Sequence, residues 1–142
     1  MSGALLDVNV LVALAWPNHV HHVAARRWFA DTHASGWATC PVTESGFIRV
    51  SSNRRVIPTA RSPREAAMLL RQLCALEGHS FWTDDVSLAS APEVDLDRVQ
   101  GYRQVTDVHL LVLAARHGGQ LVTFDRALRQ TAIGEVTVLT VG

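Results

Sequence analysis

The chain has 142 residues, of which 48% are hydrophobic and 18% charged, a composition that suits one folded domain and argues against disorder. Its 13 basic and 13 acidic residues give a formal net charge of zero, which excludes a general polyanion binder. All the basic residues are Arg, so any contact with nucleic acid must come from a local Arg patch.

Features that direct a chain to a membrane or to export are not seen in the sequence. The first residues enter a strand-like run without a basic leader segment, and no run approaches the ~20 apolar residues of a membrane helix. The two cysteines, Cys40 and Cys74, lie in apolar segments and form no CxxC motif, which indicates reduced, buried thiols. We therefore expect a cytoplasmic protein that makes no membrane contact.

Strand-like and helix-like segments alternate along the chain. In chain order, the first half predicts a strand over 4–8, a helix over 10–16, a helix over 19–33 capped by Asn18, a strand over 37–40 and a helix from Pro41. A polar, Arg-rich connection over 51–62 then leads to a capping box at Ser62 and Glu65, which begins a helix that runs to about residue 77.

The second half continues this alternation with shorter elements. It predicts a strand over 80–83, an irregular or weakly helical stretch over 84–97, a helix over 107–117 capped by Thr106, a strand over 120–124, a short helix over 125–130 and a strand over 136–141. We see no repeat or internal boundary. The order predicts a three-layer α/β/α sandwich with a mainly parallel central sheet, formed by residues 1–142 as one domain.

Four carboxylates stand where strand-like runs pass into helix-like runs. They are Asp7, Glu44, Asp107 and Asp125. Ligands of an open parallel sheet bind at the carboxyl ends of its strands. Four acids gathered there would repel one another and raise each other's pKa values, and a hard divalent cation with oxygen ligands, Mg²⁺ or Mn²⁺, removes that conflict. The pattern thus points to metal-assisted phosphoryl chemistry.

Each acid also has a structural alternative. Asp107 and Glu44 could stabilise helix N-termini through the helix dipole, and Asp125 could cap a helix. Asp7 fits this alternative less well. It lies among apolar residues, a buried carboxylate needs a partner, and no Arg lies within ten residues on either side. The acids of residues 84–97 read as solvated surface.

The acids lie in four short motifs. These are Leu-Asp-Val-Asn at 6–9, Thr-Glu-Ser-Gly-Phe-Ile-Arg at 43–49, Thr-Asp-Val-His-Leu at 106–110 and Val-Thr-Phe-Asp at 122–125. With these motifs in this order, the chain resembles the PIN-domain ribonucleases, and within them the VapC toxins of bacterial toxin–antitoxin pairs. The resemblance implies a metal-dependent endoribonuclease that forms a homodimer and is inhibited by a cognate VapB-type antitoxin.

Roles for single residues follow from this interpretation. The four acids would hold Mg²⁺ or Mn²⁺, with Glu44 orienting or deprotonating the attacking water. Asn9 and Thr123 would support the ligands or contact a substrate phosphate. Two further sets complete the interpretation: Arg49, Arg54 and Arg55 as an RNA contact, and Trp16, Val20, Trp28 and Phe29 as the seat of an antitoxin helix.

Other function classes are less compatible with the sequence. Phosphoaspartyl phosphatases and receiver domains also place an Asp after the first strand, but they need a Lys, and this chain has none. The non-enzymatic alternative is a catalytically weak PIN-like module that binds RNA or protein, and such a module would be expected to have lost some of the acids. The histidines His19, His21 and His22 read as surface residues rather than as zinc ligands, and His109 could contact substrate.

Overall fold

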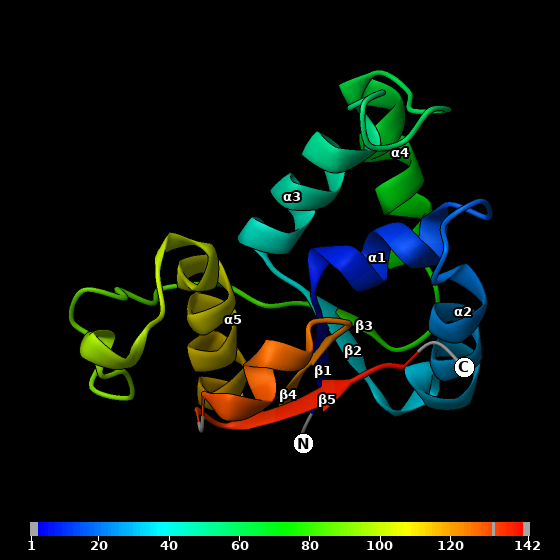
Figure 1. Cartoon of the computed structure of the whole chain (residues 1–142). Helices are drawn as coiled ribbons and strands as arrows, with labels where there is room; N and C mark the ends of the chain where they lie inside the picture. Colours follow the sequence, from blue (N-terminus) through cyan, green and yellow to red (C-terminus); the bar gives the residue numbers. More distant parts are fainter. Residues whose placement is uncertain (1–2, 132, 141–142) are drawn as a thin grey trace.

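A five-stranded, fully parallel sheet forms the centre of the protein (Figure 1). The computed structural model describes residues 3–131 and 133–140. The strands are β1 (Ala4–Leu6), β2 (Trp37–Thr39), β3 (His79–Phe81), β4 (Gln120–Thr123) and β5 (Glu135–Val138). Their order in the sheet is β3-β2-β1-β4-β5, and each neighbouring pair is parallel. The predicted α/β architecture is confirmed.

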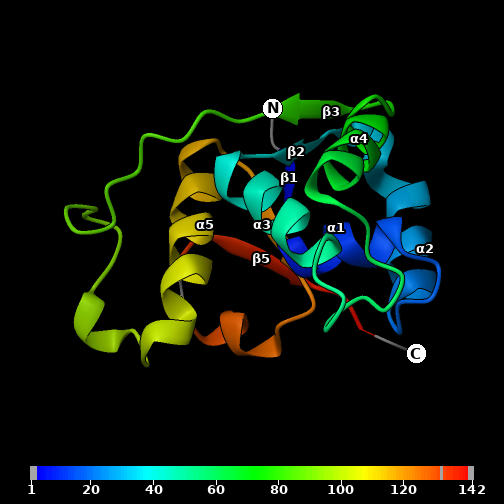
Figure 2. The same ribbon diagram turned by 90° about the horizontal axis from the view of Figure 1, so that it is seen from above.

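Five α-helices connect or flank these strands. They are α1 (Val8–Ala15), α2 (His22–Thr32), α3 (Pro41–Ser51), α4 (Pro63–Cys74) and α5 (Val105–Arg116). Four short 3₁₀ segments complete the described structure: η1 (His33–Ser35), η2 (Leu96–Arg98), η3 (Tyr102–Gln104) and η4 (Arg126–Gln130). Figures 1 and 2 show α1 and α2 on one side of the sheet, α5 on the other, and α3 with α4 beyond one edge.

The side-chain alternation of the strands divides the core into two layers. Leu6 and Trp37 point to one face and pack with α1, α2 and α4, whereas Leu5 and Ala38 point to the other and pack with α5. Each of these four side chains is almost fully buried. Because both faces are covered, the strands read as continuous apolar runs in the sequence rather than as alternating ones.

Three helix starts differ from those that the sequence predicts. The helix predicted from residue 10 begins at Val8, because β1 ends at Leu6 and the Asp7 side chain caps α1. Asn18 does not cap α2, because residues 17–21 close turns of their own, with the His19 amide donating to the Trp16 carbonyl at 2.9 Å. Thr106 lies inside the first turn of α5, since η3 runs directly into that helix. The capping box of Ser62 and Glu65 is confirmed. The last strand ends at Val138, and Val141 lies outside the described residues.

A membrane-spanning element is not found in the part of the chain that the structure describes. None of its helices is both long enough and apolar enough to cross a bilayer.

The turn between α4 and β3 depends on a glycine. Gly78 has a φ of +89°, and a Cβ built on it would lie 1.9 Å from the backbone carbonyl oxygen of His33. We expect Gly78→Ala to lower the free energy of unfolding by well over the ~1–2 kcal/mol that a left-handed conformation alone costs. Gly118→Ala is the matched control, because Gly118 has a φ of +70° with open space around it. Equal losses for both variants in urea denaturation would contradict the predicted clash.

Candidate active site

The centre of the sheet contains the point at which its connections change direction. From β1 the chain proceeds to β2 on one side, while β4 pairs with the opposite side of β1. Asp7 directly follows β1, and Asp125 lies two residues beyond the end of β4. Such a switch point opens a crevice at the carboxyl edge of a parallel sheet, and two of the four predicted acids lie at its rim.

The hydroxyl of Thr123 connects the two sides of this crevice. It donates a hydrogen bond to Asp7 Oδ2 at 2.8 Å and accepts one from Asn9 Nδ2 at 3.2 Å and one from the Asp125 amide at 3.1 Å. The second Asp7 oxygen caps α1 by accepting from the Val8 amide at 2.8 Å. Thr123 is fully buried, so the Asp7 carboxylate is fixed from both ends by short hydrogen bonds.

Asn9 adds a second connection between α1 and the end of β4. Its Oδ1 accepts a hydrogen bond from the Phe124 amide at 3.3 Å, while its amide nitrogen serves Thr123. Asn9 and Thr123 thus lie around Asp7, where the sequence predicts groups that support the metal ligands. Their observed contacts hold protein groups in position.

Three of the four acids influence one another electrostatically. Burial raises the pKa of Asp7 above its ordinary value against the hydrogen bonds from Thr123 and Val8, with a smaller contribution from Asp125. Asp107, in the first turn of α5, has its pKa raised to about 7, first by burial and then by the charges of Asp7 and Asp125. The structure therefore brings Asp7, Asp107 and Asp125 together; we call them the acid triad.

Glu44 does not join the acid triad in this structure. Its Oε2 accepts a hydrogen bond from the Thr39 hydroxyl at 2.6 Å, and its carboxylate lies beside Cys74 and His79. The helix that carries it nevertheless starts near the triad, because a Cβ on Gly46 would lie 2.6 Å from the side chain of Val8. To join the triad, the Glu44 carboxylate would have to leave the Thr39 hydroxyl.

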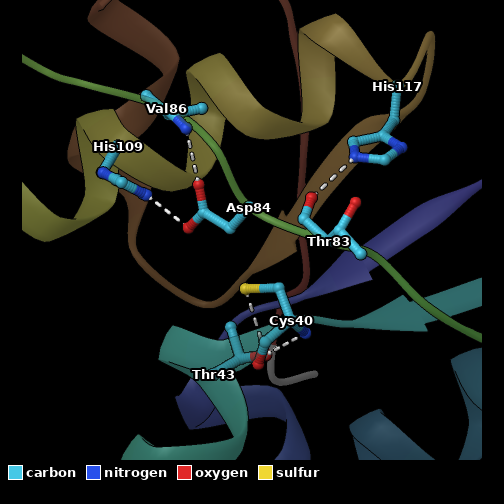
Figure 3. Close-up of polar contacts among 7 residues, drawn as sticks. All are labelled: Cys40, Thr43, Thr83, Asp84, Val86, His109 and His117. Carbon is cyan, nitrogen blue, oxygen red and sulfur yellow. Dashed lines mark hydrogen bonds and ion pairs between the residues drawn. The ribbon is translucent and has the colours of Figure 1, made fainter.

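The sequence interpretation missed one polar pair on the α5 side. Asp84, read there as a solvated acid, has a side chain only 8% exposed and lies 2.6 Å from His109 Nε2 (Figure 3). Its other oxygen accepts from the Val86 amide at 3.0 Å. His109 is therefore engaged with Asp84, and the pair ties the segment after β3 to the helix that carries Asp107. Spacing alone could not reveal it, since the two residues are 25 positions apart.

The predicted interaction surfaces are only partly exposed. Arg49, Arg54 and Arg55 are exposed, at the end of α3 and in the turn after it. Trp16, by contrast, is buried, and its Nε1 donates to Ser51 Oγ at 3.0 Å, so it belongs to the core rather than to a docking surface. Phe29 packs edge-on against Trp37.

Comparison with known proteins shows the family to which the chain belongs. The family model of the PIN domain matches residues 4–134. The chain is 55% identical over 137 residues to Ribonuclease VapC39 of Mycobacterium tuberculosis (strain H37Rv), covering 96% of this chain and 99% of that protein. The chain belongs to the PIN-domain family, and within it to the VapC ribonucleases. The resemblance drawn from the four motifs is confirmed.

Two further relatives agree with this membership. Ribonuclease VapC38 of the same strain is 55% identical over 122 residues, covering 86% of this chain and 84% of that protein. The crystal structure of DNA bound VapBC from Salmonella typhimurium is similar with a TM-score of 0.64 over 97% of this chain and 98% of that chain. At 14% sequence identity, that last likeness shows the shared fold.

The acid triad has the chemistry that a hard divalent cation requires. PIN-domain nucleases as a family use divalent metal, and the three carboxylates, of which Asp7 and Asp125 both raise the pKa of Asp107, offer oxygen ligands. A cation would relieve the repulsion that raises the pKa of Asp107. The residues present therefore fit the metal that the VapC family implies.

The raised pKa of Asp107 predicts a pH dependence of stability in the metal-free protein. Between about pH 3.8 and about pH 7, the folded protein keeps a proton on Asp107 that the unfolded chain has lost. The free energy of unfolding therefore falls as pH rises through this range, and Asp107→Asn should remove that loss. At pH 8 with a chelator present, we expect the variant to melt roughly 4 °C higher than the wild type, or more.

The control for this measurement is Asp97→Asn, which changes an exposed carboxylate. The melting temperatures of wild type and Asp107→Asn should become equal below about pH 4, where Asp107 is protonated in both the folded and the unfolded state. A constant difference between them across pH 4–8 would show that Asp107 ionisation does not cause the effect.

Proposed function

We propose that this chain, as one domain over residues 1–142, is a Mg²⁺- or Mn²⁺-dependent endoribonuclease that acts in the cytoplasm as the toxin of a toxin–antitoxin pair. The observation that carries the proposal is the convergence of Asp7, Asp107 and Asp125 at the switch point of the sheet, with the pKa of Asp107 raised to about 7. The printed names of the VapC relatives support RNA as the substrate.

Each residue of the site has a defined task in this proposal. The acid triad would hold the metal, which when bound supplies charge neutralisation at the phosphate and a more acidic water. Thr123 and Asn9 keep the Asp7 carboxylate in one orientation, so that it need not reorganise when substrate binds. Glu44, once released from Thr39, would orient the attacking water and accept its proton on a carboxylate oxygen.

The proposed partner is a VapB-type antitoxin, in keeping with the VapBC complex that shares this fold. A groove between α2 and the chain after β5 is lined by Val20, Val23, Trp28 and Leu139. Val20 is 76% exposed and Val23 67%, an unusual exposure for such apolar residues. We propose that an apolar helix of the antitoxin, or the same face of a second copy in a homodimer, covers these residues. A basic antitoxin side chain would neutralise the acid triad.

Replacement of one triad member should abolish cleavage without loss of the fold. We expect Asp107→Asn to lower the rate of RNA cleavage by more than roughly 100-fold. Loss of a residue that only hydrogen-bonds to a metal ligand already lowers activity by up to about 100-fold, and Asp107 would be a ligand itself. Mg²⁺ should raise the melting temperature of the wild type and leave that of the variant nearly unchanged. Cleavage of a defined RNA, followed by end mapping, measures the first effect.

Asp97→Asn again serves as the control and should cleave at the wild-type rate. Near wild-type cleavage by Asp107→Asn would contradict the site assignment. A wild-type protein that binds RNA but does not cleave it with Mg²⁺ or Mn²⁺ would instead favour a catalytically weak module for RNA or protein binding.

The exposed Arg residues after α3 predict a local RNA contact. Within the described residues, Arg54 and Arg55 form no ion pair with a carboxylate. The double variant Arg54→Ala/Arg55→Ala should weaken RNA binding and reduce the slope of log affinity against log salt by roughly one, since each phosphate contact on single-stranded RNA contributes about 0.7. Arg49, in the last turn of α3, is exposed as well and should add to the contact.

Arg98→Ala is the matched control, because Arg98 lies in η2 beside Asp95. It should leave the salt slope unchanged. An unchanged slope in the double variant would move the RNA path to the exposed Arg126 and Arg129 next to Asp125.

A further inference from the structure

A second group of metal-ligating side chains lies outside the acid triad. Glu44 near the start of α3, Cys74 at the end of α4 and His79 at the start of β3 each offer one ligand atom, and these atoms lie within 4.8 Å of one another. All three side chains are partly exposed, so the group is accessible from solvent. Three separate elements therefore bring a carboxylate, a thiol and an imidazole to one place.

A buried threonine organises this group. The Thr39 hydroxyl, which is fully buried, donates to Glu44 Oε2 at 2.6 Å and lies 2.8 Å from His79 Nε2. A hydroxyl has a single proton, so His79 Nε2 must be the donor in the second bond. Glu44 and His79 are thus both held next to one buried hydroxyl, which lowers the entropy that ordering them would cost on cation binding. The free lone pair of a neutral His79 is then on Nδ1, so coordination through Nε2 would require the proton to move from Nε2 to Nδ1.

Cation binding to the group would release one proton, that of the Cys74 thiol. Burial, together with the charge of Glu44, raises the pKa of the Cys74 thiol, while the Thr39 hydroxyl opposes that change. Burial lowers the pKa of His79 against the charge of Glu44, so the imidazole is neutral at pH 7. A neutral imidazole offers the lone pair of one ring nitrogen, and the thiol becomes a ligand when the cation displaces its proton, a step that the raised pKa of Cys74 opposes.

The donor set differs in kind from that of the acid triad. One sulfur, one nitrogen and one oxygen ligand suit zinc, whereas magnesium prefers oxygen alone. Zinc–ligand distances of about 2.0–2.3 Å place tetrahedral ligand atoms roughly 3.5 Å apart, so a group whose ligand atoms lie within 4.8 Å would have to contract by no more than about 1 Å. Side-chain rotation is sufficient for that movement, and a water would complete the coordination.

We propose that Glu44, Cys74 and His79 form a binding site for a borderline-soft divalent cation such as Zn²⁺, distinct from the site of the acid triad. The site needs no nuclease activity to exist. Its consequence rests on the proposed function: because Glu44 cannot serve both places, Zn²⁺ bound here withholds Glu44 from the triad and lowers RNA cleavage.

The direct test is a titration of the purified, reduced full-length protein with Co²⁺, followed by displacement with Zn²⁺. Thiolate coordination gives Co²⁺ a sulfur-to-metal charge-transfer absorption in the near ultraviolet, so the band reports Cys74 rather than carboxylates. We expect one equivalent of Co²⁺ to saturate the thiolate band, with loss of the band in Cys74→Ser and at least a tenfold weaker affinity in His79→Gln. Cys40→Ala and Asp107→Asn, which change the other thiol and the other site, should bind as the wild type does.

A second measurement uses the unmutated protein and does not depend on the folding of any variant. One equivalent of Zn²⁺ should protect Cys74 from iodoacetamide, measured by mass spectrometry of its peptide. Absence of a thiolate band together with unchanged alkylation would overturn the proposal. So would Zn²⁺ binding that survives in folded Cys74→Ser and His79→Gln, a result that would point to the histidines at 19–22.

The activity measurement separates this proposal from the proposed function. In the presence of Mg²⁺, one equivalent of Zn²⁺ should slow RNA cleavage by the wild type severalfold and slow Cys74→Ser much less. If the protein cleaves RNA but binds no Zn²⁺ through Cys74, the second site is refuted while the nuclease stands. If it binds Zn²⁺ as expected but cleaves no RNA, the second site stands and the nuclease is refuted.

Discussion

The hydrogen bond from Thr123 to Asp7 is the interaction on which the site depends. A carboxylate that follows a buried strand is costly unless it is paired, and no cation of the protein is within reach along the chain. The Thr123 hydroxyl, 116 residues away, satisfies one oxygen, and the N-terminus of α1 satisfies the other. The pairing of β1 with β4 makes the contact with Thr123 possible, so the register of the sheet centre helps to determine where Asp7 points.

A similar hydrogen bond from a threonine to a carboxylate occurs at the end of a second strand. Thr39 is the last residue of β2, as Thr123 is of β4, and each buried hydroxyl donates to a carboxylate that belongs to another element. The two threonines therefore hold two of the predicted acids apart, with Asp7 at the triad and Glu44 beside β2. This arrangement lowers the repulsion within the triad when no metal is bound, since a fourth charge is kept outside it.

Much of this architecture is readable from the sequence because its determinants are local. Buried apolar runs, the Ser62 capping box and the position of acids after strands require only neighbouring residues for their interpretation. The positions of Asp7 and Asp125 follow from the rule that parallel strands end at one edge. Asp107 lies instead in the first turn of α5, which follows η3 rather than a strand. The start of α2 was mispredicted because turns formed by His19 compete with the cap at Asn18, a balance of small terms that propensity does not resolve.

The sequence does not predict the orientation of side chains whose hydrogen-bond partners are distant in the chain. Asp84 and His109 meet only because the chain after β3 crosses the face of α5. Glu44 follows the correct strand, yet its carboxylate turns to a hydroxyl five residues earlier, beside groups from α4 and β3. Pattern and spacing locate a backbone position, whereas the rotamer depends on the packed surroundings.

The alternative positions of Glu44 make its hydrogen bond to Thr39 a quantitative constraint on catalysis. A hydrogen bond to a charged group contributes about 1.5–3 kcal/mol, so binding of Glu44 to a metal at the triad must contribute more than this to displace it from Thr39. Such a contribution corresponds to roughly a 10- to 150-fold preference between the two positions. A hard cation held by three carboxylates still has coordination positions that a fourth carboxylate can fill. Glu44 would also be required to orient the attacking water once a substrate phosphate is bound. The fold therefore leaves Glu44 available to the triad without committing it there, and this is why a small change at Thr39, Cys74 or His79 would act on the active site from outside it.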